Sequence, residues 1–454
     1  MNMQYHYKFI IFHVFCFIYF GDVDAKRHQR QQSRNSKSEL AKVVANDKIR
    51  KSEQNKSNIQ PDQVTFHQTN TDSSLYIETH QLKKVIPQDI YSTDVTATKS
   101  RSIQIRVLLA DTPSPAHWSI LSESGFWLLD PRNQKRRISV DAASMTLLCH
   151  TGSIFINNRR LTRNEVVVKA KEGNVIFDGR TYQGSLYIVS HGEKTLLINC
   201  IDLEDYVACV LYSEAWPGWP QEMNKVLAIA IRSYGVAMMR QAADSKRIYH
   251  VKNNVAHQVY AGVHGNKLLH DAVLQTGGII MTYKNKPIIA MYDACCGGIV
   301  TARMKGINFT QAPYLARKTS CTSCKTCKIF SWTAEFDKGE LTTLLKRHIP
   351  KLSRIKSLYV SKKDPAGLVQ QVSIKSGQGF VSISGKKMYG LPKIKSFCYT
   401  IENTPSKIIF KGRGYGHHVG LCQWGACQMV RDGTDYKRTL HFYYPGVTFM
   451  KIVR

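Results

Sequence analysis

The sequence predicts an α+β protein with a β-rich N-terminal section, a central helical segment and a mixed C-terminal part. Short apolar runs separated by turn dipeptides occur up to about residue 199. The apolar period then changes to that of a helix, and strand-like runs return after residue 278. With 454 residues and 43% hydrophobic content, the chain can form one large domain or two ordinary ones.

The β-rich section begins at Ser102, where apolar residues start to alternate along 103–109 as in a half-buried strand. Further strand-like runs lie at 145–148, 153–156, 166–168, 186–190 and 196–198. Asn157-Asn158, Glu172-Gly173 and Asp178-Gly179 provide turn chemistry between them.

Two helices are expected next. Along 202–214, Leu203, Val207 and Leu211 fall on one helical face. A Pro-Gly-Trp-Pro run at 217–220 ends this helix, and its last proline suits the first turn of a second helix. Later strands are expected at 278–283, 287–292, 355–361, 369–376, 380–384 and 408–410.

Residues 1–25 have the pattern of a secretory signal peptide. Lys8 precedes an apolar run at 9–20, and a small-x-small exit ends at Ala25. We therefore expect an exported protein of the periplasm or cell envelope, which argues against nucleic acid as a partner. An uncleaved N-terminal anchor is the alternative.

Residues 26–100 are predicted to form a disordered basic linker. Ten Lys/Arg and three Asp/Glu occur in 26–60, with few aromatic residues. Such a segment cannot bury enough apolar surface to offset its ordering entropy. Because the whole chain carries a net charge of +30, the linker could contact a membrane surface or an anionic wall polymer, or act as a solvated spacer. Residues 101–454 are expected to form the folded domain.

One carboxyl in the helical segment has surroundings suited to acid–base chemistry. Glu214 lies where the first helix runs into the proline-containing turn, close to Trp216 and Trp219. Aromatic, water-poor surroundings disfavour a charged carboxylate and raise its pKa toward the range of a general acid. By itself the pattern also fits a solvated or helix-capping glutamate. Arg232, on the second helix, could return to the same site.

Five ordered sequence blocks resemble the SpoIID/LytB family. The central block reads LEDYV, SEAWP and AIAIRSY between Leu203 and Tyr234. The others are YQGSL at 182–186, QVYAG at 258–262, CGG at 296–298, and GRGYGHHVGLCQWGA at 412–426 followed by YYPG at 443–446. The last block departs from the family pattern at His418, where relatives usually have glycine, and at Cys422, where they usually have serine.

The resemblance implies an exported lytic transglycosylase that cleaves the MurNAc–GlcNAc bond of peptidoglycan strands, preferring strands stripped of stem peptides, in cell-wall remodelling or division. The family's catalytic glutamate falls on Glu214. One carboxyl suffices, because the muramic acid C6 hydroxyl can act as the nucleophile, whereas a hydrolase needs a second carboxylate. We predict substrate-binding positions at Arg232, Tyr206, Tyr260, Gly416, His417 and Gln423, with the hypothesis that Arg232 meets the lactyl carboxylate or orients Glu214.

The same resemblance permits a different function. Some LytB-type members are described as glycan-binding enhancers of an N-acetylmuramoyl-L-alanine amidase, which would make an amidase the partner. No nucleotide cofactor is expected, because the Gly412-x-Gly414 spacing does not continue as a dinucleotide-binding loop.

The cysteines leave two alternatives open. Eleven follow residue 25, and an odd number in an oxidising compartment requires a free thiol, a metal site or an intermolecular bond. Cys321, Cys324 and Cys327, with Cys296 upstream, have a spacing compatible with a structural zinc ion. Two disulfide-bonded pairs fit the same spacing.

Overall fold

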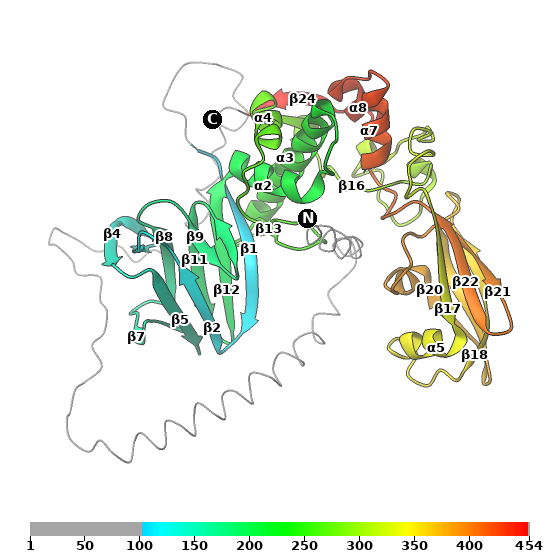
Figure 1. Ribbon diagram of the computed structural model, residues 1–454, viewed down its shortest axis with the longest axis horizontal. Helices are drawn as coiled ribbons and strands as arrows, with labels where there is room; N and C mark the ends of the chain where they lie inside the picture. The colour runs from blue at the N-terminus through cyan, green and yellow to red at the C-terminus, as the bar shows by residue number, and fades with distance from the viewer. Residues whose placement is uncertain (1–101, 453–454) are drawn as a thin grey trace, which may run out of the picture.

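The structure is a computed structural model that describes residues 102–452 (Figure 1). The expected signal peptide at 1–25 and linker at 26–100 lie outside the described residues. The α+β class is confirmed: β-sheets come first, helices follow in the centre, and the C-terminal part is mixed. No helix in 102–452 is long and apolar enough to cross a membrane.

Two antiparallel sheets form most of the β-rich section. Their strands are β1 (Gln104–Pro113), β2 (Ala116–Leu121), β3 (Phe126–Asp130), β4 (Asn133–Val140), β5 (Ser144–His150), β6 (Ser153–Ile156), β7 (Arg159–Arg160), β8 (Glu165–Ala170), β9 (Val175–Phe177), β10 (Arg180–Tyr182), β11 (Ser185–His191) and β12 (Lys194–Asp202). One sheet has the order β13-β1-β12-β11-β8-β3-β4, in which the short β13 (Val251–Lys252) is the one strand that pairs parallel with its neighbour, and the other has the order β10-β9-β2-β5-β6-β7.

Alternation along the strands places every second side chain in a core that the two sheets share. In β11, Leu186 and Ile188 are buried while their neighbours are more exposed. The core also contains Ile120 and Met145 from the second sheet. The predicted turns are confirmed where Asn157 and the residue after it adopt positive φ, a conformation that asparagine tolerates.

Three helices form the centre of the molecule: α2 (Leu203–Glu214), α3 (Gln221–Asp244) and α4 (Lys267–Gln275). The Asp202 carboxylate caps α2 by accepting a hydrogen bond from the backbone of Glu204. Helix α3 begins after Pro220 and is buried along most of its length. These two helices are the ones that the sequence predicts.

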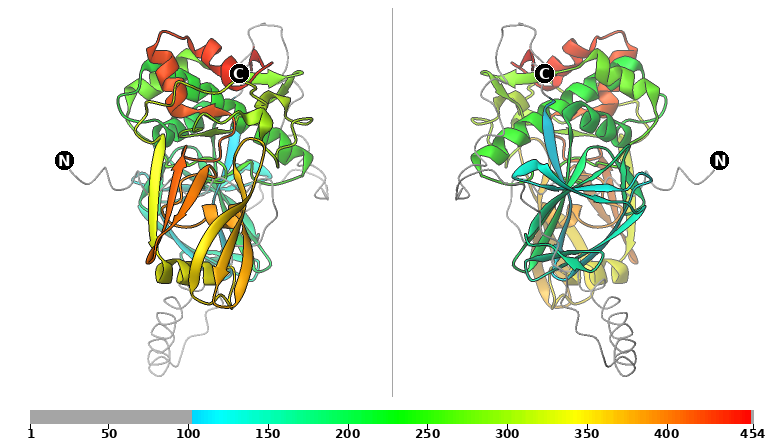
Figure 2. Two further views of the ribbon diagram at one scale, coloured as in Figure 1. Left: turned by 90° about the vertical axis from the view of Figure 1, so that its right-hand side faces the viewer. Right: turned by 90° about the vertical axis from the view of Figure 1, so that its left-hand side faces the viewer.

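The chain returns to this centre at its C-terminal end. The elements are β13 (Val251–Lys252), β14 (Ile279–Tyr283), β15 (Lys286–Pro287), β16 (Tyr292–Asp293), β23 (Leu421–Cys422), α7 (Gln423–Arg431), α8 (Tyr436–Tyr443) and β24 (Thr448–Lys451). Strand β24 pairs with β14, and the short strands β16 and β23 run parallel. Helices α7 and α8 lie beside α3, as Figure 2 shows.

Between these elements a second unit forms its own core. Two 3-10 turns, η4 (Thr301–Arg303) and η5 (Pro313–Leu315), lead to β17 (Ser331–Asp337), α5 (Lys338–Lys346), β18 (Ile355–Lys363), β19 (Val369–Ser376), β20 (Gly379–Ser384), α6 (Gly385–Tyr389), β21 (Tyr399–Asn403) and β22 (Lys407–Arg413). Its core includes Phe336, Leu358 and Phe410. This unit, yellow to orange in Figure 1, extends from the helical part away from the β-rich section. We refer to residues 331–413 as the inserted unit.

Candidate functional site

Glu214 is the last residue of α2, and the chain leaves the helix at Ala215 with an extended conformation. The Glu214 side chain is buried, with 7% of the residue exposed. The backbone N–H of Val259 donates to its Oε1 at 3.4 Å. No lysine, arginine or histidine in 102–452 forms an ion pair with it at 4.0 Å or less. The carboxyl is therefore buried without a positive counter-charge.

This environment changes the acidity of Glu214. Burial raises the pKa of its carboxyl to about 7, and hydrogen bonding by the Val259 N–H, Tyr292 and Gln423 opposes part of the rise. Such a pKa lets the group exist in both protonation states near neutral pH. The sequence predicts this direction from the neighbouring aromatic residues.

Three tryptophans lie together after α2. Trp424 packs edge-on against Trp216, with ring centroids 5.6 Å apart, and against Trp219 at 6.0 Å. The ammonium of Lys328 lies 5.6 Å from the Trp216 ring centroid. Trp216 and Trp424 are partly exposed, so this side of the site presents aromatic surface and a positive charge.

A buried hydrogen-bond chain connects α2 with Tyr292. The Tyr206 hydroxyl donates to Oε1 of Gln258 at 2.7 Å, and Nε2 of Gln258 donates to the Tyr292 hydroxyl at 3.4 Å. Tyr292 in turn stabilises the charged form of Glu214. Tyr206, predicted as a substrate-binding residue, has no exposed surface and lies in this supporting chain.

Gln423, the first residue of α7, has no exposed surface. Neither its Nε2 nor its Oε1 has an ordinary hydrogen-bond partner within residues 102–452. Its amide nevertheless interacts with Glu214 and lowers the pKa of that carboxyl. The interaction therefore has a looser geometry than an ordinary hydrogen bond, and the amide retains hydrogen-bonding capacity.

Arg232 occupies a different position from the one expected. Its guanidinium binds both oxygens of Glu204, at 3.0 and 2.7 Å, and donates to the carbonyl of Ile279 at 3.1 Å. Burial lowers the pKa of Arg232 to about 9, which leaves it charged at neutral pH. With no exposed surface, Arg232 stabilises the opposite end of α2 from Glu214.

Tyr260 is also part of the interior. Its hydroxyl donates to Oδ1 of Asn199 at 2.6 Å, and its ring lies between those of Tyr182 and Tyr206, with centroids 5.7 and 5.6 Å away. It has no exposed surface. Of the residues predicted to surround Glu214, the structure brings Gln423 into direct interaction with it and Tyr206 into indirect connection.

Gly416 and His417 belong to the loop that precedes β23. Gly416 has φ of +127°, and a Cβ there would lie 2.4 Å from Cβ of Asp293, so only glycine fits. His417 is buried, and burial lowers its pKa to about 3, so its ring is neutral at pH 7. His418 is buried too: its backbone N–H donates to Oδ2 of Asp293 at 2.6 Å. The added side chain at 418 therefore points into the interior.

A family of known proteins matches the segment that carries Glu214. The family model described as stage II sporulation protein (SpoIID) matches residues 191–283, which carry α2, α3 and Glu214. The chain belongs to the SpoIID family. A domain of unknown function (DUF8618) matches residues 310–420, which contain the inserted unit.

The relatives of this SpoIID-family chain have different printed names. It is 30% identical over 293 residues to an uncharacterized protein of Brachyspira hyodysenteriae, covering 64% of this chain and 78% of the relative. It is 24% identical over 365 residues to the amidase enhancer of Bacillus subtilis, covering 68% of this chain and half of that relative. It is 26% identical over 260 residues to stage II sporulation protein D of Bacillus subtilis, covering 54% and 74%.

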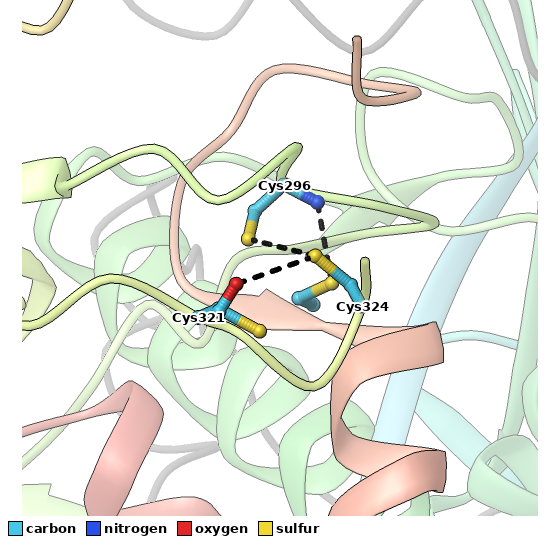
Figure 3. A group of neighbouring side chains, drawn as sticks. Cys296, Cys321 and Cys324 are labelled. Atoms are coloured by element: carbon cyan, nitrogen blue, oxygen red, sulfur yellow. Dashed lines mark hydrogen bonds between the residues drawn. The ribbon is translucent and has the colours of Figure 1, made fainter. Parts of the chain in front are cut away.

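Beside the SpoIID segment lies a cluster of buried cysteines that could hold a structural zinc ion (Figure 3). The Sγ atoms of its four members lie within 4.8 Å of one another: Cys296, Cys321, Cys324 and Cys422. We call this group the four-cysteine centre. Four thiols in this arrangement are the donor set that zinc prefers in structural sites.

The membership of the cluster corrects one prediction. Cys327 was among the predicted candidates, but it lies outside this group: its Sγ is 3.7 Å from Sγ of Cys295, which also interacts with Cys324 and Cys422. The fourth member is Cys422, which follows the inserted unit in the chain. One feature of the sequence could have indicated this fourth member: position 422 is a cysteine where relatives usually have serine.

Proposed function

We propose that this protein is a lytic transglycosylase that cleaves peptidoglycan glycan strands, with Glu214 as its acid and base. The observation that carries the proposal is a buried carboxyl that has no cationic partner within residues 102–452 and a pKa of about 7. Membership of the SpoIID family supports the substrate class.

The reaction needs one proton-transfer group acting twice. Protonated Glu214 donates its proton to the glycosidic oxygen as the C1–O bond breaks. The resulting carboxylate then accepts the proton of the muramic acid C6 hydroxyl, whose oxygen bonds to C1 to form a 1,6-anhydro ring. Glu214 ends protonated, ready for the next cycle. A pKa near the working pH serves both steps.

The surroundings of Glu214 favour this chemistry over hydrolysis. A hydrolase requires a second carboxylate near the first. In the part of the chain that the structure describes, the groups that act on the Glu214 carboxyl are the Val259 N–H, Tyr292 and Gln423, and none of them is a carboxylate. Glu204 is held in its ion pair with Arg232, and Asp293 accepts a hydrogen bond from the backbone of His418.

We assign substrate contact to the residues with available surface. The partly exposed rings of Trp216 and Trp424 suit stacking against sugar faces, and Lys328 suits the lactyl carboxylate of a stripped strand. Gln423 has no exposed surface, so we assign its amide to holding Glu214 and not to contact with the sugar. Arg232, Tyr206 and Tyr260 then support the site from behind.

The test is product analysis. Purified protein is incubated with glycan strands stripped of stem peptides, and the products are separated and identified by mass spectrometry. We expect 1,6-anhydromuramyl ends from the wild type and none from Glu214→Gln. Reducing ends without anhydro products would indicate hydrolysis and overturn the proposal.

The second candidate is a non-catalytic enhancer of an amidase, favoured by the relative named amidase enhancer. It predicts that the wild type binds stripped strands without producing new ends, and that it accelerates peptide release by a separate amidase. In both proposals the protein is exported and works on the wall in the periplasm or cell envelope, as the pattern of residues 1–25 and family membership suggest.

A further inference from the structure

The four-cysteine centre has sulfur spacings suited to a metal ion. Its Sγ atoms lie within 4.8 Å of one another, and those of Cys296 and Cys324 are 3.9 Å apart. Four sulfurs at about 2.3 Å from a tetrahedral zinc ion are separated by about 3.8 Å. The four residues are almost fully buried, so a bound ion would be shielded from water.

Polar hydrogens surround these sulfurs. The backbone N–H groups of Cys296 and Gly425 point to Sγ of Cys422, at 3.2 and 3.4 Å. The Tyr443 hydroxyl lies 3.1 Å from Sγ of Cys321. Hydrogen bonds of this kind orient thiolate ligands and disperse their negative charge. Because a Cβ at Gly425 would lie 2.5 Å from Sγ of Cys321, the helix can approach the centre only with glycine there.

A buried arginine provides an independent observation. Arg317 is 2% exposed, and its Nη2 lies 3.7 Å from Sγ of Cys296. Within residues 102–452 no carboxylate lies in ion-pair distance of its guanidinium, and the Asp293 carboxyl interacts with it only from farther away. A buried charge needs a counter-charge. Four thiolates around one Zn²⁺ carry a net charge of −2 and supply it.

The centre is connected to both side chains that stabilise charged Glu214. Strands β16 and β23 pair in parallel, with Tyr292 opposite Leu421 and Asp293 opposite Cys422. Gln423 directly follows Cys422, and Cys296 lies three residues after the end of β16, the strand that carries Tyr292. Both side-chain partners of Glu214 are thus close in the chain to a member of the centre.

The centre also closes the base of the inserted unit. Three of its members lie before that unit, namely Cys296 and the two cysteines of the loop at 321–324, and Cys422 lies after it. Nearby, the backbone N–H of Gly414 donates to the carbonyl of Phe330 at 2.6 Å. A metal ion here would link three segments of the chain. They are the loop before the inserted unit, the strand β23 after it, and the segment with Cys296 that follows β16.

We propose that the four-cysteine centre binds one Zn²⁺ as a tetrathiolate, and that this ion holds Tyr292 and Gln423 in position against Glu214. The first half concerns the metal alone. The second half rests on the proposed catalytic role of Glu214. Cys296, Cys321, Cys324 and Cys422 are ligands in this proposal, and the last of them also caps α7.

Metal analysis of the purified protein tests the ligand set. We expect about one zinc ion per chain in the wild type and in Cys327→Ser, and loss of zinc in Cys324→Ser and Cys422→Ser. Serine at 422 retains a capping side chain, so this variant is suited to remain folded, and circular dichroism checks that it does. Cobalt-substituted wild type should show the absorption of a tetrahedral thiolate site. Disulfides among the four cysteines in unreduced protein, or zinc retained by both ligand variants, would overturn the assignment.

The positioning role has readouts other than cleavage. Because Trp424 follows Gln423 and packs on Trp216 and Trp219, metal removal should shift tryptophan emission reversibly, and more in the wild type than in Trp424→Phe. Cleavage should fall about 100-fold in folded Cys422→Ser, mainly in kcat, as expected for misplaced groups. Zinc-free protein with unchanged emission and unchanged kcat would overturn the positioning role. Full cleavage by Glu214→Gln would overturn the proposed function instead, leaving the metal result intact.

Discussion

Helix α2 has a buried glutamate at each end, and the two differ in what neutralises them. Glu204, at the N-terminal end, is bound through both carboxylate oxygens by Arg232, and its Oε1 also accepts from the backbone of Gly278 at 3.0 Å. Glu214, at the C-terminal end, receives the Val259 N–H at 3.4 Å and has no cationic partner within residues 102–452.

The difference separates a structural carboxylate from a reactive one. A buried carboxylate that is paired and hydrogen-bonded keeps its charge, while one without a counter-charge shifts toward the protonated form. The N-terminal end of a helix also favours negative charge, and the C-terminal end does not. The position of Glu204 near the N-terminus of α2 and its ion pair with Arg232 therefore both favour its charged form.

The largest effect on cleavage is expected when Glu214, at the C-terminal end of α2, loses its ability to transfer a proton. Glu214→Gln retains shape and burial but cannot transfer a proton, so we expect cleavage of stripped strands to fall by about 10²- to 10⁴-fold. Release of anhydro ends over time measures it. Glu222→Gln, at a partly exposed position in the first turn of α3, is the matched control and should cleave like the wild type. Equal losses in both variants would contradict the assignment.

The next largest effect, on stability, is expected when Glu204 loses its ion pair with Arg232. Arg232→Met leaves a buried carboxylate without its counter-charge, which should lower the free energy of unfolding by about 3–5 kcal/mol. Denaturant titration followed by circular dichroism measures the loss. Adding Glu204→Gln to Arg232→Met should recover a large part of it, because the uncompensated charge is gone. If the double variant is no more stable than Arg232→Met, the ion pair is not the cause.

A third prediction concerns stability and pH at Glu214. Its pKa is about 7 in the folded protein against 4.5 ordinarily, so between these values the folded state binds more protons than the unfolded state. Stability contributed by this group is fully present below about pH 4.5 and is lost as pH rises through about 7. Glu214→Gln should therefore be more stable than the wild type at about pH 8, by up to about 3 kcal/mol.

The same variant is expected to match the wild type near pH 4, where both carry a neutral group. Denaturant titrations at the two pH values give the difference directly. Glu222→Gln again serves as the control, with no gain at either pH. A constant difference between Glu214→Gln and the wild type at all pH values would mean that Glu214 does not titrate as described.

The sequence predicted those features that depend on local pattern. The helix ending at Glu214 and the break at Pro217 follow from apolar spacing and proline chemistry, and the turn at Asn157 from the tolerance of asparagine for positive φ. The raised pKa of Glu214 was also predicted in direction, and its cause is the burial of the carboxyl.

Features that depend on long-range packing were not predicted. Nothing local tells whether Arg232 meets the glutamate at one end of α2 or the other, because the two helices cross only in the folded state. Cys422 joins Cys321 and Cys324 only because the inserted unit returns to its starting point. Alternation along 355–384 predicts strands, but it does not show that they close a second core.

The smallest expected effect is a change in the pKa of Glu214 that leaves the carboxyl itself in place. Tyr292→Phe removes a hydroxyl that stabilises the charged carboxylate, so the pKa of Glu214 should rise further. A hydrogen bond contributes about 0.5–1.5 kcal/mol, which corresponds to a rise of about one unit or less. Since cleavage begins with the protonated acid, the fall of kcat/KM at alkaline pH should move upward by that amount. Tyr283→Phe, whose ring packs on Tyr314 away from this hydrogen-bond chain, should leave the profile in place. A downward shift in Tyr292→Phe would mean that the hydroxyl stabilises the protonated form instead.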